Sequence, residues 1–367
     1  MALSFHKRVL SAERYESAGI FDVNGDGIPD IVSGGYWYQG PDFKRQHKIG
    51  GVTAHDEYYD DFSTIAMDIN GDGRLDYLTG GWWGQTLRWR ENTGDYTRDW
   101  PEHIVAQTGS IESTRAWDVD GDGELEIVPN TPGAPLVVYK LIRDAQGKGT
   151  GRFAAHKLKM AGRENDHQGH GLGFGDLTGN GRGDFVLANG WLEAPADPYQ
   201  GTWTWHPDFT LGRAPSVPIL VVDLNGDGQN ELILGEGHGY GLSWWDYRLD
   251  AAGKRTWTRH EIDPLSSQYH DLQWVDIDGD GQNELITGKR FRAHPQGDGG
   301  DKDPYGWYVF KWTGESFAKH VIDFGPLGTG KGLGIHFAVA DLDGDGRLDV
   351  VAPGKDGLAI YFNQGNT

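Results

Sequence analysis

The 367-residue chain contains no cysteine, so its sequence excludes disulfide bonds and thiolate chemistry. It also has no apolar run of the roughly 18 residues that a membrane-spanning helix requires, and we predict no membrane span. No low-complexity tract or block of like charge indicates a linker, so we expect one domain covering residues 1–367. Residues 1–10, MALSFHKRVL, lack the apolar segment of a signal peptide. We expect an extracytoplasmic or secreted protein whose signal peptide is not visible in this chain.

Positive charge is scarce, because 33 Lys and Arg residues face 54 Asp and Glu residues, for a net charge of −21. Such a protein repels phosphates, which argues against a nucleic-acid partner. The sequence suggests no organic cofactor, and it leaves the oligomeric state open. By contrast, 57 glycines, 15 tryptophans and 15 tyrosines indicate many short strands joined by tight turns, with aromatic surfaces between them.

The acidity is concentrated in one loop that occurs seven times. DVNGDGIPD begins at Asp22, and related loops follow from residues 68, 118, 176, 223, 276 and 341. Oxygen side chains occupy positions 1, 3, 5 and 9, and glycines at positions 4 and 6 let the backbone curl, as Ca²⁺ ligation requires. A β run follows each loop where an EF-hand would have a helix, which excludes the EF-hand. We therefore predict structural Ca²⁺ sites.

Six of these loops retain a complete ligand set, whereas the fourth carries Thr178 and Asn180 and should bind Ca²⁺ weakly. The predicted ligands of the six are Asp22, Asn24, Asp26, Asp30, Asp68, Asn70, Asp72, Asp76, Asp118, Asp120, Asp122, Glu126, Asp223, Asn225, Asp227, Glu231, Asp276, Asp278, Asp280, Glu284, Asp341, Asp343, Asp345 and Asp349.

Each repeat has the pattern of four strands, and the seventh stops after three. Residues 3–10 resemble the fourth strand of the other repeats, so they are expected to supply the missing outer strand of the last one. The sequence thus predicts an all-β, seven-bladed β-propeller in which the N-terminal strand closes the ring and removes an open sheet edge.

The loop pattern D-x-[DN]-G-D-G-x-x-[DE] resembles the FG-GAP or VCBS repeat over nearly the whole chain. Proteins with this repeat include integrin α heads, fungal lectins and propeller carbohydrate lyases such as ulvan lyases, rhamnosyl-glucuronate lyases and aldos-2-ulose dehydratase. The resemblance implies a scaffold and, through the lyases, a sugar or polysaccharide as the partner.

Propeller topology places residues that precede each inner strand at the end opposite the calcium loops, around a central funnel. Two histidines three residues apart, His167 and His170, precede the fourth inner strand in this way. Histidines from different blades could also converge there on a second divalent metal. The candidate ligands of this central metal are His170, His270 and His336.

A lyase that performs β-elimination on a uronic or keto sugar needs a base and a cation to stabilise an enolate-like charge. We predict His170 or His270 as the base, Tyr269 as proton donor, and Lys289 and Arg290 as the cations. Aromatic, acidic and basic side chains at the same end form the expected substrate site. These are Tyr36, Trp37, Asp61, Trp82, Trp83, Glu112, Trp191, Glu193, His238, Tyr240, Arg292 and His294.

Two other functions agree with the same residues. A lectin-like propeller would bind glycans without chemistry, although lectin propellers usually repeat one pocket and here the funnel residues differ in every blade. A glycoside hydrolase would pair Glu112 with Asp61 or Glu193 as its two carboxylates.

Overall fold

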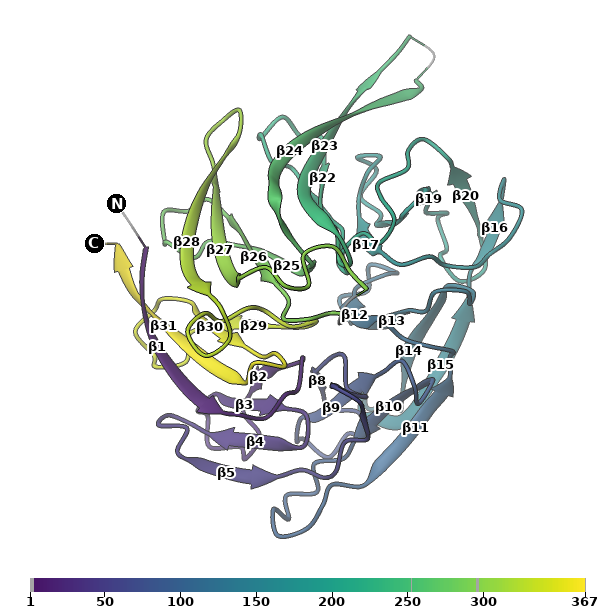
Figure 1. The fold of residues 1–367 in the computed structure, drawn as a ribbon. Helices are drawn as coiled ribbons and strands as arrows, with labels where there is room; N and C mark the ends of the chain where they lie inside the picture. Colours follow the sequence, from purple (N-terminus) through teal and green to yellow (C-terminus); the bar gives the residue numbers. More distant parts are fainter. Residues whose placement is uncertain (1–2, 252, 295–296, 367) are drawn as a thin grey trace.

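The computed structural model describes residues 3–251, 253–294 and 297–366. Within these ranges the chain forms 31 strands and no helix, and seven sheets are arranged around a ring (Figure 1). No helix of the described chain is long and apolar enough to cross a membrane. The protein is therefore an all-β, seven-bladed β-propeller.

The first three blades follow the chain from its inner to its outer strands, and a small hairpin, β6 (Ala54–His55) with β7 (Tyr58–Tyr59), lies between the first two. Blade one contains β2 (Gly19–Phe21), β3 (Asp30–Ser33), β4 (Tyr36–Gln39) and β5 (Arg45–Lys48). Blade two contains β8 (Ile65–Met67), β9 (Asp76–Gly80), β10 (Thr86–Arg90) and β11 (Glu102–Gln107). Blade three contains β12 (Ser113–Trp117), β13 (Glu126–Asn130), β14 (Val137–Arg143) and β15 (Gly149–Lys157).

Blade four has a fifth strand at its outer edge, where β16 pairs parallel with β20. It contains β16 (Lys159–Ala161), β17 (Leu172–Gly175), β18 (Asp184–Leu187), β19 (Gly190–Glu193) and β20 (Thr202–His206). Blade five contains β21 (Leu220–Val222), β22 (Glu231–Gly235), β23 (Tyr240–Leu249) and β24 (Arg255–Ser267). Blade six contains β25 (Tyr269–Val275), β26 (Glu284–Lys289), β27 (Tyr305–Trp312) and β28 (Phe317–Gly325).

Blade seven combines the two ends of the chain. Its inner strands are β29 (Ala338–Ala340), β30 (Asp349–Ala352) and β31 (Leu358–Asn366), and its outer strand is β1 (Leu3–Ser11). β1 runs antiparallel to β31, with His6 opposite Phe362, and the two lie side by side in Figure 1, β1 in purple and β31 in yellow. This pairing covers the strand edge that blade seven would otherwise expose.

Histidines that recur on the outer strands belong to the packing of the blades. His47 stacks on Trp37 and His206 on Trp191, each at 4.1 Å between ring centroids, and His260 stacks on Trp244 at 4.0 Å. Both Trp37 and Trp191 are buried, so the stacks fill the apolar space between strands and neighbouring blades. The outer-strand histidines therefore have a structural role.

The two ends of the propeller carry different loops. The connections between the first and second strands of each blade, which contain the acidic repeats, form what we call the loop end. The connections into each inner strand and those between the second and third strands form the funnel end. In blade four, for example, His170 precedes β17 and Asp176 follows it, so the two lie at opposite ends of one inner strand.

Candidate functional site

Four side chains from different blades converge at the funnel end. Glu112 precedes β12, His170 precedes β17, His238 lies between β22 and β23, and His270 is the second residue of β25. Each offers one ligand atom, and these four atoms all lie within 4.8 Å of one another. Glu112 Oε2 lies 3.5 Å from His170 Nε2 and 3.8 Å from His270 Nε2. We call these four residues the funnel cluster.

In His170 and His238, Nδ1 donates a hydrogen bond, which leaves Nε2 available. His170 Nδ1 donates to the carbonyl of Pro215 at 2.8 Å, and His238 Nδ1 donates to Asp298 Oδ2 at 2.9 Å. Among the described residues, His170 Nε2 and both ring nitrogens of His270 are buried without a hydrogen-bond partner. Buried polar atoms are rarely unpaired, so these nitrogens are candidates for binding a ligand.

Backbone geometry brings the histidines together. The pairing of β25 with β26 shifts by one residue between Tyr269 and Leu272, and this bulge turns His270 into the funnel. Gly237 supplies the space, because a Cβ atom there would lie 3.2 Å from both His170 Cε1 and His270 Cδ2. A larger residue at this position would crowd both rings.

Burial and charge set the protonation of the cluster. Burial lowers the pKa of His270 well below its usual value and that of His238 to about 4, so both are neutral near pH 7. Burial opposes protonation of His170 as well, but the Glu112 carboxylate outweighs it and raises the pKa of His170. Burial would raise the pKa of Glu112, yet the two neighbouring histidines hold it well below the usual range. The cluster therefore presents two neutral imidazoles, His238 and His270, and a third, His170, that is paired with a carboxylate. Imidazoles and a carboxylate are the donor types of a transition-metal site.

A cavity of about 200 Å³ borders the cluster. Of the four cluster residues, Glu112 and His238 line it, together with Arg290. Its remaining wall is mostly aromatic: Tyr58, Phe62, Trp82, Trp83 and His294. Trp82 and Trp83 are each 36% exposed, and the Trp83 ring stacks on His55 at 4.7 Å between centroids.

A buried ion pair and a pair of hydrogen bonds to Asp298 hold the polar groups of this cavity. Arg290 forms a bidentate pair with Glu16, at 2.7 Å from Nε to Oε1 and 3.0 Å from Nη2 to Oε2. Asp298 Oδ2 accepts hydrogen bonds from His238 Nδ1 at 2.9 Å and from His294 Nδ1 at 3.0 Å. Asp298 thus orients one histidine of the cluster and one of the cavity wall.

The structure corrects three predicted roles. His336 does not join the predicted central metal site, because its Nδ1 accepts the backbone N–H of Thr64 at 3.3 Å, and His238 takes its place. Tyr269 is buried and donates its hydroxyl to Asp263 at 2.6 Å, away from the cluster. Lys289 is also buried and donates to Gln268 Oε1 at 2.7 Å, so it does not reach the cavity.

Several predicted substrate-binding residues have structural roles instead. Trp37 and Trp191 are core residues in the stacks described above. Asp61 is buried and accepts hydrogen bonds from Ser17, Tyr77 and Thr79. Glu193 ends β19 at the loop end and pairs with His206 at 2.9 Å, so neither carboxylate can act with Glu112 as predicted for a hydrolase.

Three further candidates lie at the funnel end but outside the lining of the 200 Å³ cavity. Tyr36 packs near Tyr15, at 6.4 Å between ring centroids. Tyr240 donates its hydroxyl to Asp303 at 2.6 Å, and Arg292 pairs with Glu57 at 2.7 Å. Of the predicted residues, Trp82, Trp83, Glu112, His238, Arg290 and His294 line the cavity.

The site also contains residues that the sequence analysis did not select: Glu16, Tyr58, Phe62 and Asp298. Tyr58 and Phe62 lie in the segment HDEYYDDFS before the second inner strand, so their position at the funnel end was a usable signal. Asp298 belongs to the long connection between β26 and β27, whose path no periodic pattern in the sequence predicts.

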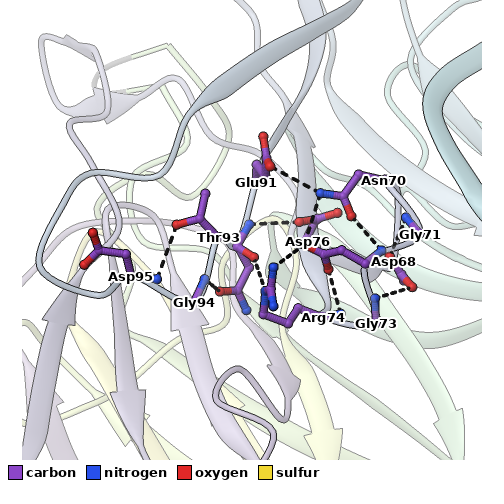
Figure 2. Close-up of polar contacts among 12 residues, drawn as sticks. Asp68, Asn70, Gly71, Gly73, Arg74, Asp76, Glu91, Thr93, Gly94 and Asp95 are labelled. Carbon is purple, nitrogen blue, oxygen red and sulfur yellow. Dashed lines mark hydrogen bonds and ion pairs between the residues drawn. The ribbon is translucent and has the colours of Figure 1, made fainter.

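At the loop end, the acidic repeats curl as their glycines require. In blade two, Asp68 accepts the N–H groups of Gly71 at 2.8 Å and Gly73 at 3.0 Å (Figure 2). Both glycines have positive φ, 78° and 87°, which favours glycine at these positions. Glu91, which directly follows β10, accepts a hydrogen bond from Asn70 Nδ2 at 3.3 Å and so lies beside this loop.

The geometry defines a class: a seven-bladed propeller with acidic glycine-rich loops at one end and a histidine-lined cavity at the other. The sequence profile of the FG-GAP-like repeat matches residues 22–79, 68–128 and 199–287, more than half of the chain. The chain therefore belongs to the FG-GAP-like repeat family.

A search of curated protein sequences finds no relative of this chain. Among solved structures, Saccharomyces cerevisiae Sqt1 is 11% identical, with a TM-score of 0.54 and all of both chains covered. A Bacillus licheniformis rhamnogalacturonan lyase is 14% identical, with a TM-score of 0.47, covering 100% of this chain and 75% of the lyase. An Agrocybe aegerita lectin is 17% identical, with a TM-score of 0.44, covering 83% and 80%. At these identities the similarity concerns the fold alone.

Proposed function

We propose that the funnel cavity is the active site of a carbohydrate lyase that performs β-elimination on a uronic or keto sugar. The observation that supports this most is the funnel cluster: buried imidazole nitrogens without hydrogen-bond partners, next to a cavity with a mostly aromatic wall. Trp82 and Trp83 offer ring faces on which a sugar can stack, and a volume of about 200 Å³ suits one sugar ring.

We further propose that Glu112, His170, His238 and His270 hold a divalent metal ion. Three Nε2 atoms and one carboxylate oxygen within 4.8 Å of one another suit a compact metal such as Zn²⁺. Asp298 would orient His238 as carboxylates commonly orient metal-bound histidines. Such an ion, when bound, would stabilise negative charge on a carbonyl or carboxylate oxygen of the substrate.

The base is then a residue of the cavity wall. His270 is fully buried and His170 faces the cluster, so neither predicted base reaches a substrate in the cavity. His294 lines the cavity, and its Nδ1–H bond to Asp298 leaves Nε2 free to accept a proton. In the proposed reaction, Nε2 removes the proton on the carbon next to the sugar carboxylate or carbonyl. Those electrons form the new C=C bond, the C–O bond at the β carbon breaks, and the leaving oxygen takes a proton from water.

Arg290 supplies positive charge beside this reaction. Arg290 lines the cavity, and the bidentate pair with Glu16 holds its guanidinium in place. A fixed cation suits the carboxylate of a uronic acid and the enolate-like charge of the transition state. A lectin-like function requires no such buried, unpaired imidazoles, which is why we favour the enzyme.

Calcium in the acidic loops is a separate part of the proposal. Loops one, two, five and seven combine three or four carboxylates with glycine-rich turns, a donor set that fits Ca²⁺. The role of the ion there would be to stabilise the blades.

A screen of uronates and keto sugars tests the activity, because elimination creates a conjugated double bond that absorbs in the ultraviolet and hydrolysis does not. Metal analysis after exhaustive dialysis would show which metal the funnel cluster binds and how many ions each chain retains. We expect one tightly held transition metal per chain in addition to calcium. Glu112→Gln should lower that content, and His294→Gln should retain it while losing at least about a hundredfold in turnover.

Asp298→Asn is the matched variant, since it preserves shape and removes the charge that orients His238. We expect its affinity for the metal to fall by about 10–100-fold. If the wild-type protein retains no transition metal and no substrate in the screen gives an absorbing product, the proposed function is wrong.

A further inference from the structure

Two of the seven acidic loops contain a lysine ammonium among their carboxylates. In blade three, Lys140 Nζ lies 2.5 Å from Asp120 Oδ2, 2.5 Å from Asp122 Oδ2 and 3.0 Å from Glu126 Oε1. In blade six, Lys311 Nζ lies 2.5 Å from Asp278 Oδ2, 2.6 Å from Asp280 Oδ2 and 3.2 Å from Glu284 Oε1. In both loops these carboxylates are at positions 3, 5 and 9, the positions that would ligate a metal.

Both lysines occupy the same position in their blades. Each lies on the third strand, directly opposite the residue at position 9 of the loop. Lys140 follows Tyr139, which pairs with Ile127, and Lys311 follows Phe310, which pairs with Leu285. By the same register, the equivalent residues of the other blades are Gln39, Glu91, Glu193, Asp246 and Phe362.

In five of the seven blades this third-strand residue complements the charge of its loop. Four loops have an uncharged residue at position 3: loops two, four and five face an acidic side chain, Glu91, Glu193 or Asp246, whereas loop one faces Gln39. Loops three and six have carboxylates at all four ligand positions, and each faces a lysine. Two copies of the same combination are difficult to explain by the general acidity of the protein.

Loop seven also has four carboxylates, but it has aspartate at position 9, where loops three and six have glutamate. In loop seven, Asp349 Oδ1 accepts the N–H of Asn363 and Oδ2 that of Leu342, so the backbone binds both oxygens. In loop three, Glu126 Oε2 accepts the N–H of Val119, and the longer side chain presents Oε1 to Lys140. Glutamate at position 9 thus extends one oxygen toward the ammonium.

We propose that loops three and six are closed by an internal cation: Lys140 and Lys311 occupy the position that the repeat gives to Ca²⁺, and these two loops fold without metal. This reverses the simplest interpretation of the sequence, in which four carboxylates bind Ca²⁺ most tightly. An ion would have to displace an ammonium that already has three charged partners, whereas loop seven has the same carboxylate count and Phe362 in place of the lysine.

Calcium binding to the full-length chain, counted by equilibrium dialysis at saturating Ca²⁺, tests the proposal. Lys311→Met should add one bound ion per chain, and so should Lys140→Met, because each exposes four carboxylates that only a cation can neutralise. Lys44→Met, at an exposed position beside Asp42, is the control and should leave the count unchanged. No change in the count for either loop variant would overturn the proposal.

A second pair of variants avoids dependence on the folding of the lysine variants. Asp345→Ala removes the carboxylate at position 5, which every proposed Ca²⁺ loop has, so the count should fall by one as loop seven loses its ion. Asp280→Ala, at the same loop position in blade six, should leave the count unchanged because Lys311 already occupies that loop. If Asp280→Ala also loses one ion, loop six binds Ca²⁺ and the proposal is wrong.

Discussion

The two ends of the propeller use buried and clustered charge in opposite ways. At the loop end, carboxylates accept several backbone N–H groups, as Asp176 does from Gly179 at 2.7 Å and Gly181 at 2.7 Å, so removing the charge removes fold contacts. At the funnel end, His170 and His270 keep buried ring nitrogens without hydrogen-bond partners among the described residues. Such atoms cost stability and are retained where a ligand satisfies them. Residues that stabilise the fold and residues proposed to act on a substrate therefore lie at opposite ends of the same inner strand.

The largest effects on turnover and on melting temperature should come from two separate alanine variants, one at each end of β17. His170→Ala should reduce turnover by more than about a hundredfold, since even an orienting partner of a metal ligand is worth 10–100-fold. Its melting temperature should stay near that of the parent. Asp176→Ala should show the reverse, a lower melting temperature with turnover largely kept. Thermal melting and activity measured on both variants decide this; similar losses of stability in both would show that the two ends are not independent.

Loss of Ca²⁺ should have the next largest effect, and dialysis into Ca²⁺-free buffer that contains Zn²⁺ confines this effect to the loop end. Removing Ca²⁺ leaves the carboxylates of loops one, two, five and seven unneutralised, so we expect the melting temperature to fall by several degrees or more. His170→Ala should show the same fall as the parent protein. An unchanged melting curve after Ca²⁺ removal would contradict a stabilising role for calcium.

The smallest effect concerns a buried cation near the funnel. Burial lowers the pKa of Lys289 from 10.5 to about 8, so the folded protein binds this proton less tightly than the unfolded chain does. The destabilisation is complete below pH 8 and disappears as the pH rises toward 10.5. Lys289→Met should therefore melt a few degrees higher than the parent at pH 7, with the gain shrinking toward pH 10. A gain that grows with pH would contradict this assignment.

Much of the fold follows from short-range patterns that the sequence displays. Seven glycine-rich acidic loops and four strands per repeat predict the seven blades, because each loop has the same backbone requirement and each strand the same alternation. The outer-strand histidines could be assigned to packing because they recur. The funnel residues do not recur, and the sequence indicated only which end of the propeller they occupy.

What the sequence by itself determined is therefore the scaffold and the face on which each candidate lies. Tertiary structure decided which candidates meet: His238 and Glu112 join His170 and His270, while His336 binds the backbone of Thr64. It also placed Lys140 and Lys311 among the carboxylates of loops three and six, whose sequences predict metal sites. Both outcomes depend on strand register, a bulge in β25 and the path of a long connection, and these fix side-chain directions over distances that no local pattern encodes.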